Sequence, residues 1–283
     1  MSVAVVTDST SYLPVGAAVS LGIRVVPLHV IVGSASHLDG VSLSPADLAA
    51  AMTKRVRVST SRASVAELAA TYRSAMEAGA SAVVAVHLSR QLSGTWEAAR
   101  LAAEELGGQR VVRIVDSKSA AMGLGFAVLA AATAARNGAS AAEVEQVAVA
   151  TAERSRTFFS VDTLEHLRRG GRIGAAAALL GTALAVKPLL HVHEGRIAPL
   201  EKVRTGSKAI SRLAELAAQV AGTGPCRVAV HHLAAPAPAE RLAERLRQRL
   251  PGLVECVTCE LGAVLGAHTG PGALGVVVLP AGA

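Results

Sequence analysis

The apolar run Ala82-Val83-Val84-Ala85-Val86 is followed closely by Leu92-Ser93-Gly94-Thr95-Trp96 and then by Glu97-Ala98-Ala99-Arg100-Leu101-Ala102. The first segment predicts a buried strand, the second a turn of small hydroxylated residues, and the third a helix that begins at once. A turn of this kind directs hydroxyl groups and the unpaired backbone N–H groups of the first helical turn toward one point. That point suits a small anionic head group.

Strands alternate with helices along the first 154 residues. We expect strands at 3–7, 23–32, 82–86 and 111–115, and a brief extended segment at 58–61. Helices are expected at 45–54 with Ser44 as its cap, at 64–78 with Ser64 as its cap, at 95–106 and at 120–137. This alternation predicts an α/β domain over residues 1–154, with a mostly parallel sheet flanked by helices.

The pattern changes after about residue 154. Strands are expected at 158–161, 189–193, 197–203, 227–231 and 254–259, with helices at 207–220 and 239–250. Short turns such as Glu194-Gly195 separate neighbouring strands, so residues 155–283 predict an α+β domain with a substantially antiparallel sheet. Whether the last strand returns to the first domain is left open. The apolar segment from Ile173 to Val186 predicts a buried helix, and it is too short to cross a bilayer.

Polar turns follow three of the predicted strands in the first domain. They are Asp8-Ser9-Thr10, the segment from Ser89 to Thr95, and Asp116-Ser117. Ligands of parallel sheets bind beyond the carboxyl ends of the strands, so we expect these turns to gather at one edge. Two glycine-containing segments share this polar character, Arg168-Arg169-Gly170-Gly171-Arg172-Ile173-Gly174 and Gly266-Ala267-His268-Thr269-Gly270-Pro271-Gly272.

Composition narrows the functional classes. Of the 283 residues, 51% are apolar but only 2% are aromatic, so the interior must be aliphatic. The net charge of +7 is compatible with an acidic ligand or partner, but scattered arginines without aromatic platforms argue against nucleic acid. Three cysteines, an odd number without a signal peptide, indicate a reducing cytoplasm. Cys256 and Cys259 have no second pair, and His191 and His193 no carboxylate cluster, so no metal site is expected.

Eight segments in order resemble the DegV family, the bacterial fatty-acid-binding proteins. They are Val5-Val6-Thr7-Asp8-Ser9-Thr10, Thr60-Ser61-Arg62-Ala63-Ser64, Leu92-Ser93-Gly94-Thr95, Asp116-Ser117, Asp162-Thr163-Leu164, 168–174, Lys187-Pro188-Leu189-Leu190 and 266–275. The resemblance covers essentially the whole chain. Two departures are visible: Arg62-Ala63 replaces the family's usual Gln-Pro, and Ser89-Arg90 stands where a Ser-Ser pair is common.

The resemblance implies that a fatty acyl chain binds between the two domains. It implies that Thr60 and Ser93 hydrogen-bond the carboxylate, with a protonated or donor His268 close by and Ser61, Gly94 and Thr95 around them. It further implies a non-catalytic carrier without a cofactor, which presents its lipid to a partner fatty-acid kinase. Arg172 would contact that partner, no membrane-spanning segment is expected, and transient contact with a membrane surface is left open.

Several alternatives stay open at this stage. Residues 168–174 are equally compatible with a plain turn between helices, and His268 with a loop histidine whose hydrogen bonds are satisfied internally. A lipid-responsive regulatory protein is a second functional hypothesis. A stand-alone enzyme acting on a small acidic substrate is a third, although Ser93 lacks the G-x-S-x-G frame of a hydrolase and the chain contains no GxxxxGK[ST] loop for ATP.

Overall fold

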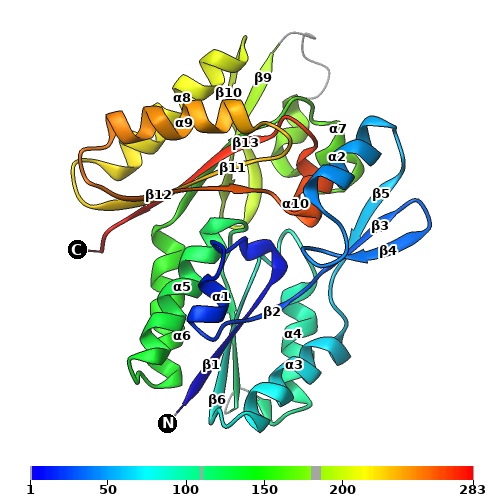
Figure 1. Ribbon diagram of the computed structural model, residues 1–283, viewed down its shortest axis with the longest axis vertical. Helices are drawn as coiled ribbons and strands as arrows, with labels where there is room; N and C mark the ends of the chain where they lie inside the picture. Colours follow the sequence, from blue (N-terminus) through cyan, green and yellow to red (C-terminus); the bar gives the residue numbers. More distant parts are fainter. Residues whose placement is uncertain (1, 109–110, 180–185, 283) are drawn as a thin grey trace. The chain divides into compact units, whose positions relative to one another are not determined.

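The computed structural model describes residues 2–108, 111–179 and 186–282 (Figure 1). The chain forms two compact units, and each is built from two separate stretches of sequence. The first unit comprises Met1–His29 and Ser61–Glu153, and the second comprises Val30–Thr60 and Arg154–Ala283.

The first unit contains a four-stranded parallel sheet. Its strands are β1 (Val3–Asp8), β2 (Arg24–Val26), β6 (Ala82–His87) and β7 (Val112–Asp116), in the order β2-β1-β6-β7. The central strands β1 and β6 are runs of β-branched and small residues with both faces covered, which is the composition that a buried parallel strand requires. The predicted parallel sheet is confirmed.

Helices cover both faces of this sheet. The helix α5 (Met122–Arg136) packs on β1 and β6, and α6 (Ala141–Arg154) lies on the same side, whereas α3 (Val65–Glu77) and α4 (Thr95–Glu104) pack together on the other side (Figure 1). A short 3-10 helix, η1 (Ser9–Ser11), and α1 (Ala17–Ser20) follow β1. The sequence pattern did not predict α6. The buried face of this helix includes Val144, Ala148 and Ala152, whose side chains are small, and its other positions hold both polar and apolar residues.

The second unit contains a six-stranded sheet in the order β10-β9-β8-β13-β11-β12. Its strands are β8 (Arg156–Ser160), β9 (Lys187–His193), β10 (Arg196–Val203), β11 (Cys226–His232), β12 (Leu253–Glu260) and β13 (Leu274–Pro280). All pairings are antiparallel except β11 with β12, as the sequence predicts in outline. The helices α8 (Gly206–Ala221) and α9 (Pro236–Arg249) lie side by side on one face (Figure 1). The last strand, β13, lies between β8 and β11, within this unit.

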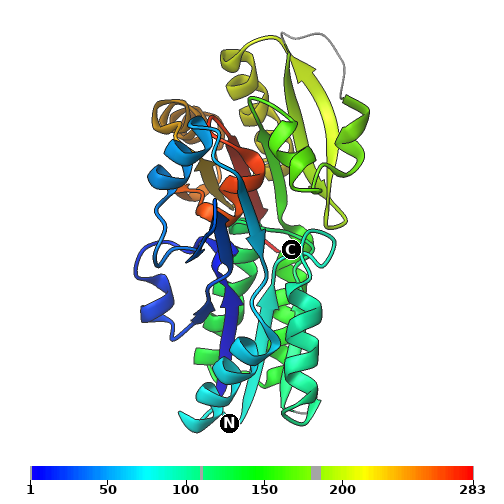
Figure 2. The ribbon, with the colours of Figure 1, turned by 90° about the vertical axis from the view of Figure 1, so that its right-hand side faces the viewer.

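Residues 30–60 belong to the second unit, whereas the sequence analysis placed them in the first domain. This stretch contains β4 (Ala35–Leu38), α2 (Pro45–Thr53) and most of β3 (His29–Val32) and β5 (Val58–Ser61), which form a sheet in the order β4-β3-β5. The physical reason is packing: α2 lies against α10 (Ala263–Thr269), near the other end of the chain, and α10 in turn packs against α7 (Glu165–Arg169). Figures 1 and 2 both show the blue α2 beside the red α10.

Two sequence-based expectations are wrong in detail. The single strand expected at 23–32 is two strands, β2 and β3, because Pro27 has no N–H to donate at that point. The buried helix expected from Ile173 to Val186 begins instead as a 3-10 helix, η3 (Gly174–Leu179), in which Ala176 is buried and Ala175, Ala177 and Ala178 are exposed. Its expected continuation over 180–185 lies outside the described residues. No described helix combines the length and the hydropathy needed to cross a membrane.

Candidate ligand-binding site

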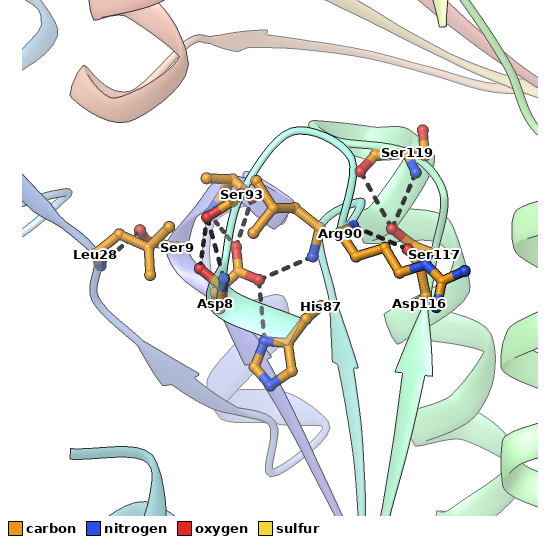
Figure 3. Close-up of polar contacts among 12 residues, drawn as sticks. Asp8, Ser9, Leu28, His87, Arg90, Ser93, Asp116, Ser117 and Ser119 are labelled. Carbon is orange, nitrogen blue, oxygen red and sulfur yellow. Dashed lines mark hydrogen bonds and ion pairs between the residues drawn. The ribbon is translucent and has the colours of Figure 1, made fainter. Parts of the chain in front are cut away.

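The three polar turns of the first unit lie at one edge of its sheet, as expected. They follow β1, β6 and β7, which are adjacent parallel strands that end on the same side (Figure 3). At this edge Asp116 accepts hydrogen bonds through Oδ1 from the backbone N–H groups of Lys118 at 2.9 Å and Arg90 at 3.3 Å. Ser117 and Ser119 bond to each other, so the turn after β7 is ordered by its own side chains.

A fully buried carboxylate, that of Asp8, joins the ends of β1 and β6. Its Oδ2 accepts hydrogen bonds from His87 Nδ1 and from the N–H of Leu88, each at 3.0 Å, and its Oδ1 accepts from the N–H of Thr10 at 3.1 Å (Figure 3). Tyr72 lies 3.2 Å from His87 Nε2, and burial together with the Asp8 charge raises the pKa of its phenol. Asp8 therefore positions the loop that leads to Ser93, whereas the sequence pattern predicts it only as part of a polar turn after the first strand.

Ser93 lies in the turn directly before α4. Its Oγ accepts a hydrogen bond from the N–H of Thr95 at 3.2 Å and lies 2.9 Å from Thr95 Oγ1. The N-cap residue of α4 is Gly94, which has no side chain to bond the N–H groups of the first turn. Backbone donors and one hydroxyl hydrogen of the Ser93–Thr95 pair are therefore available to an anion at this end of α4.

Arg62 lies against this turn. Its Nη1 donates a hydrogen bond to the carbonyl of Gly94 at 3.2 Å, and its Cδ lies 3.3 Å from the point where a Cβ on Gly94 would stand. The preceding residue, Ser61, is exposed and donates from Oγ to the carbonyl of Arg62 at 3.3 Å. The departure from the family's Gln-Pro sequence therefore places a guanidinium group beside Gly94.

In the second unit the structure brings together Thr60, at the end of β5, and His268, on α10. Thr60 Oγ1 lies 2.8 Å from His268 Nε2, although the two residues are 208 positions apart. Burial, with the nearby charge of Arg172, lowers the pKa of His268 to about 4. Without a ligand the imidazole is therefore neutral at pH 7.

His268 has one ring nitrogen without a partner. Among the described residues no group hydrogen-bonds its buried Nδ1. Burying an unpaired N–H group costs more free energy than burying an unpaired nitrogen lone pair. We therefore place the lone pair on Nδ1 and the proton on Nε2. In this tautomer Nε2–H donates to Thr60 Oγ1, and the hydroxyl hydrogen of Thr60 is left free to donate to a ligand.

The two glycine-containing segments identified in the sequence pack against each other. A Cβ on Gly170 would stand 2.1 Å from Nδ1 of His268, and a Cβ on Gly270 would stand 2.2 Å from Cδ2 of His166. Gly170 therefore makes room for His268, and Gly270 makes room for His166 on α7. Arg172 belongs to the same arrangement, because its Nη1 donates to the carbonyl of Gly170 at 2.6 Å.

Thr60 and His268 line a pocket of about 1130 Å³ in the second unit. The charged residues that line it are Glu165 and four arginines, Arg55, Arg57, Arg169 and Arg172. Thr60, His268 and Arg172 are thus three predicted site residues that the structure brings together, while Ser61, Ser93, Gly94 and Thr95 lie in the first unit. Within the described parts of the chain, no group of three or more His, Cys, Asp or Glu residues has the arrangement of a metal site.

Residues 2–281 match the family model described as "Uncharacterised protein, DegV family". The chain belongs to the DegV family. Among DegV relatives, a DegV domain-containing protein of Streptomyces coelicolor is 54% identical over 276 residues, which cover 98% of each chain. The protein DegV of Bacillus subtilis is 37% identical over 281 residues, 98% of each chain.

Solved DegV structures share this fold. A structure described as fatty acid binding of a DegV family protein from Thermus thermophilus matches with a TM-score of 0.94 and 34% identity, over 99% of this chain and 100% of that one. DegV from Bacillus subtilis, described as a fatty acid binding protein, matches with a TM-score of 0.88 and 33% identity, over 99% and 100%. The predicted family and the mixed α/β fold are confirmed.

Proposed function

We propose that this chain binds a single long-chain fatty acid and holds its carboxylate with Thr60 and Ser93, beside His268. The observation that supports this most directly is the Thr60–His268 pair at 2.8 Å, which lines a pocket in a chain whose solved relatives are described as fatty-acid-binding. Thr60 and Ser93 belong to different units. The proposal therefore requires one ligand to be contacted by both units, with the acyl chain between them.

The chemistry of the donors suits a carboxylate. A buried charge needs compensating hydrogen bonds, because an unpaired one costs more than burial of the tail can offset. Neutral His268 orients the Thr60 hydroxyl as a donor, and α4 supplies backbone N–H groups next to Ser93. Uncharged donors of this kind hold a carboxylate while leaving one of its oxygens accessible, whereas a bidentate arginine would cover both.

The tail supplies the affinity. Burying ~15 methylene and methyl groups at ~0.8 kcal/mol each gives a gross gain of about 12 kcal/mol. Association and ordering costs are of similar order, so the net affinity depends on how well the head group is satisfied. Specific donors at the head group therefore set the orientation of the lipid.

As a finer part of the proposal, the chain acts as a non-catalytic carrier that presents the carboxylate to a partner fatty-acid kinase in the cytoplasm. The sequence contains no GxxxxGK[ST] loop, so a nucleoside triphosphate would come with the partner. Arg172 supports a partner contact, because it lines the pocket that contains Thr60 and His268. Its hydrogen bond to Gly170 also ties it to the backbone against which His268 packs.

Isosteric removal of the hydroxyls tests the head-group assignment. We expect Thr60→Val and Ser93→Ala each to bind hexadecanoate ~10- to 100-fold more weakly than the parent in a calorimetric titration, because each loses a hydrogen bond to a charged group. Thr133→Val is the matched control, since the Thr133 hydroxyl is exposed and bonds only the carbonyl of Leu129. Parent-like affinity in both site variants would contradict the assignment.

The partner role needs a separate experiment. We expect Arg172→Ala to retain fatty acid but to support little acyl-phosphate formation when a fatty-acid kinase and ATP are added. Unchanged coupled activity would contradict a role for Arg172 in the partner contact. Lipid-dependent capture of a protein that is not a kinase would favour the regulatory hypothesis instead.

A further inference from the structure

Three fully buried polar side chains form a connected network in the first unit. They are Tyr72 on α3, His87 at the end of β6 and Asp8 at the end of β1, each with an exposed fraction of 0%. His87 lies between the other two, with Nε2 3.2 Å from the Tyr72 hydroxyl and Nδ1 3.0 Å from Asp8 Oδ2 (Figure 3). Buried polar groups are stable only when each has a hydrogen-bond partner, so the three side chains constrain one another.

The chemistry of these groups determines the direction of both hydrogen bonds. The oxygens of Asp8 are surrounded by donors, because two backbone N–H groups and the Thr10 hydroxyl also reach them. His87 therefore donates to Asp8 from Nδ1–H, and the neutral ring presents the lone pair of Nε2 to the phenol. Burial and the Asp8 charge raise the pKa of Tyr72, so the phenol keeps its proton and donates it to Nε2.

The same carboxylate holds the start of the turn that contains Ser93. Asp8 Oδ2, the oxygen that accepts from His87, also accepts from the N–H of Leu88 at 3.0 Å. The next residue, Ser89, is fully buried, and its carbonyl accepts from the N–H groups of Leu92 at 2.9 Å and Ser93 at 3.1 Å. The turn thus closes on Ser89, directly after the residue that Asp8 holds.

From these contacts we infer that Tyr72 is a positioning residue for the fatty-acid carboxylate. Tyr72 is buried and gives no donor to the ligand itself. It acts through the ring of His87 on Asp8, and through Asp8 on the backbone that leads to Ser93. The inference rests on the proposed function, in which Ser93 and the N–H groups of α4 hold the carboxylate.

Trp96 provides a readout of this turn that does not require a ligand. It is the single tryptophan of the chain and lies in the first turn of α4, three positions after Ser93. The guanidinium group of Arg90, which comes from the same turn, stands over its ring at 5.5 Å from the centroid. A displacement of the turn should change this contact, and with it the tryptophan emission excited at a wavelength that tyrosine does not absorb.

Tyr72→Phe removes the hydroxyl and keeps the ring. We expect this variant to bind hexadecanoate ~3- to 10-fold more weakly than the parent in a calorimetric titration, because a displaced turn satisfies the carboxylate less well. The Ser89 N–H also donates to the carbonyl of Ser119 at 2.8 Å, and this second anchor should keep the loss below that of Ser93→Ala. The Trp96 emission of the unliganded variant should differ from that of the parent.

A double-mutant cycle tests whether Tyr72 acts through His87. In His87→Asn the side-chain amide can replace Nδ1–H as a donor to Asp8, but it is too short to reach Tyr72. Adding Tyr72→Phe to His87→Asn should therefore change hexadecanoate affinity by less than ~2-fold. Thr151→Val is the control for stability, because it removes a buried hydroxyl from α6 in the same unit, where Oγ1 donates to the carbonyl of Val147 at 2.7 Å. This control should keep the parental affinity and Trp96 emission.

The outcomes separate the positioning role from the proposed function. Parent-like hexadecanoate affinity in Tyr72→Phe, or the same loss with and without His87→Asn, would overturn the positioning role while leaving fatty-acid binding intact. An equal loss of affinity in Thr151→Val would overturn it as well, since lower stability alone would then explain the effect. A parent that does not bind hexadecanoate would instead overturn the proposed function and the inference with it.

Discussion

At the scale of single residues, the packing of His268 against Gly170 determines how His268 and Thr60, the proposed head-group residues, are arranged. Gly170 has an ordinary backbone conformation, so its importance lies in the space it leaves and not in its flexibility. Because His268 Nδ1 occupies that space, the ring has one orientation in which Nε2 reaches Thr60. A small residue at position 170 is therefore a requirement of the site, although it makes no polar side-chain contact.

Gly170→Ala should disturb this arrangement. The added Cβ would stand 2.1 Å from Nδ1, so the ring of His268 must leave the position in which it contacts Thr60. We expect a loss of ~1–3 kcal/mol in the free energy of unfolding, measured in urea, and weaker fatty-acid binding. Gly224→Ala is the matched control, because no atom lies within 4 Å of its added Cβ. Unchanged stability and binding in Gly170→Ala would contradict the packing argument.

His268 also makes a prediction about pH. Its pKa is about 4 in the folded chain and about 6.5 in an unfolded one, so between these values only the unfolded state binds the proton. Stability is therefore lost as pH falls from 6.5 to 4, by an amount on the order of 3 kcal/mol for this residue. Burial also lowers the pKa of His231 to about 4. The difference between the parent and His268→Gln, measured by urea unfolding across this range, isolates His268.

The expected difference has a definite sign. As pH falls, the parent should lose stability relative to His268→Gln, whose side chain does not titrate. The imidazole resonances of His268 should show a midpoint near pH 4 by NMR. A midpoint near 6.5 would mean that the ring is solvated, and it would contradict the burial of His268.

The role of a residue was predictable where it depends on neighbouring residues in the sequence. It was not predictable where the residue contacts a distant part of the chain. Ser44 and Ser64 were expected as helix caps from their neighbours alone, and both accept a hydrogen bond from the residue three positions on. The turn with Ser93 was selected by its position between a strand and a helix, and the roles of Thr60 and His268 by family resemblance, but the contacts of all three depend on tertiary structure. Asp8 was predicted only as part of a polar turn, because its partners His87 and Leu88 lie 79 and 80 positions away.

At the scale of elements, α10 is capped by a residue from outside its own sequence neighbourhood. Its N-cap residue, Gly262, makes no side-chain hydrogen bond. Instead Oδ1 of the buried Asp39 accepts from the N–H of Ala263 at 2.7 Å and from that of Val264 at 3.4 Å. Asp39 therefore connects the 30–60 stretch to the helix that contains His268.

Asp39→Ala should loosen α10 and with it the Thr60–His268 pair. Leaving buried N–H groups without an acceptor should lower the free energy of unfolding by ~2 kcal/mol, and fatty-acid affinity should fall as well. Asp39→Asn retains an acceptor oxygen, so its free energy of unfolding and its fatty-acid affinity should fall less than those of Asp39→Ala. Glu240→Ala, an exposed change on α9, should stay within ~0.5 kcal/mol of the parent. Equal binding by the parent and Asp39→Ala would show that α10 needs no such cap.

The bounds of strands and helices with a strong hydrophobic periodicity were predictable to within a few residues. The strands β1 and β6 and the helices α8 and α9 have uninterrupted apolar patterns that match their burial. The helix α6 was missed because alanine supplies much of its buried face, and η3 was mistaken for a buried helix because a run of alanines is apolar whether or not it is covered. Low aromatic content makes such segments harder to classify.

At the scale of the whole molecule, the chain leaves its first unit at residue 30 and returns at residue 61. Sequence patterns place boundaries where composition changes, and the composition of 30–60 resembles that of its surroundings. Only the packing of α2 against α10, more than 200 residues later, assigns this stretch to the second unit. The fold class was therefore predictable, while the division of the chain was not.

Binding of one fatty acid per chain, through donors from Thr60 and Ser93, can be measured by native mass spectrometry of the purified protein followed by organic extraction. We expect one fatty acid per chain, restored by added hexadecanoate after stripping, and a much smaller bound fraction in Ser93→Ala. A protein that is empty as purified and stays empty with added fatty acid would contradict it.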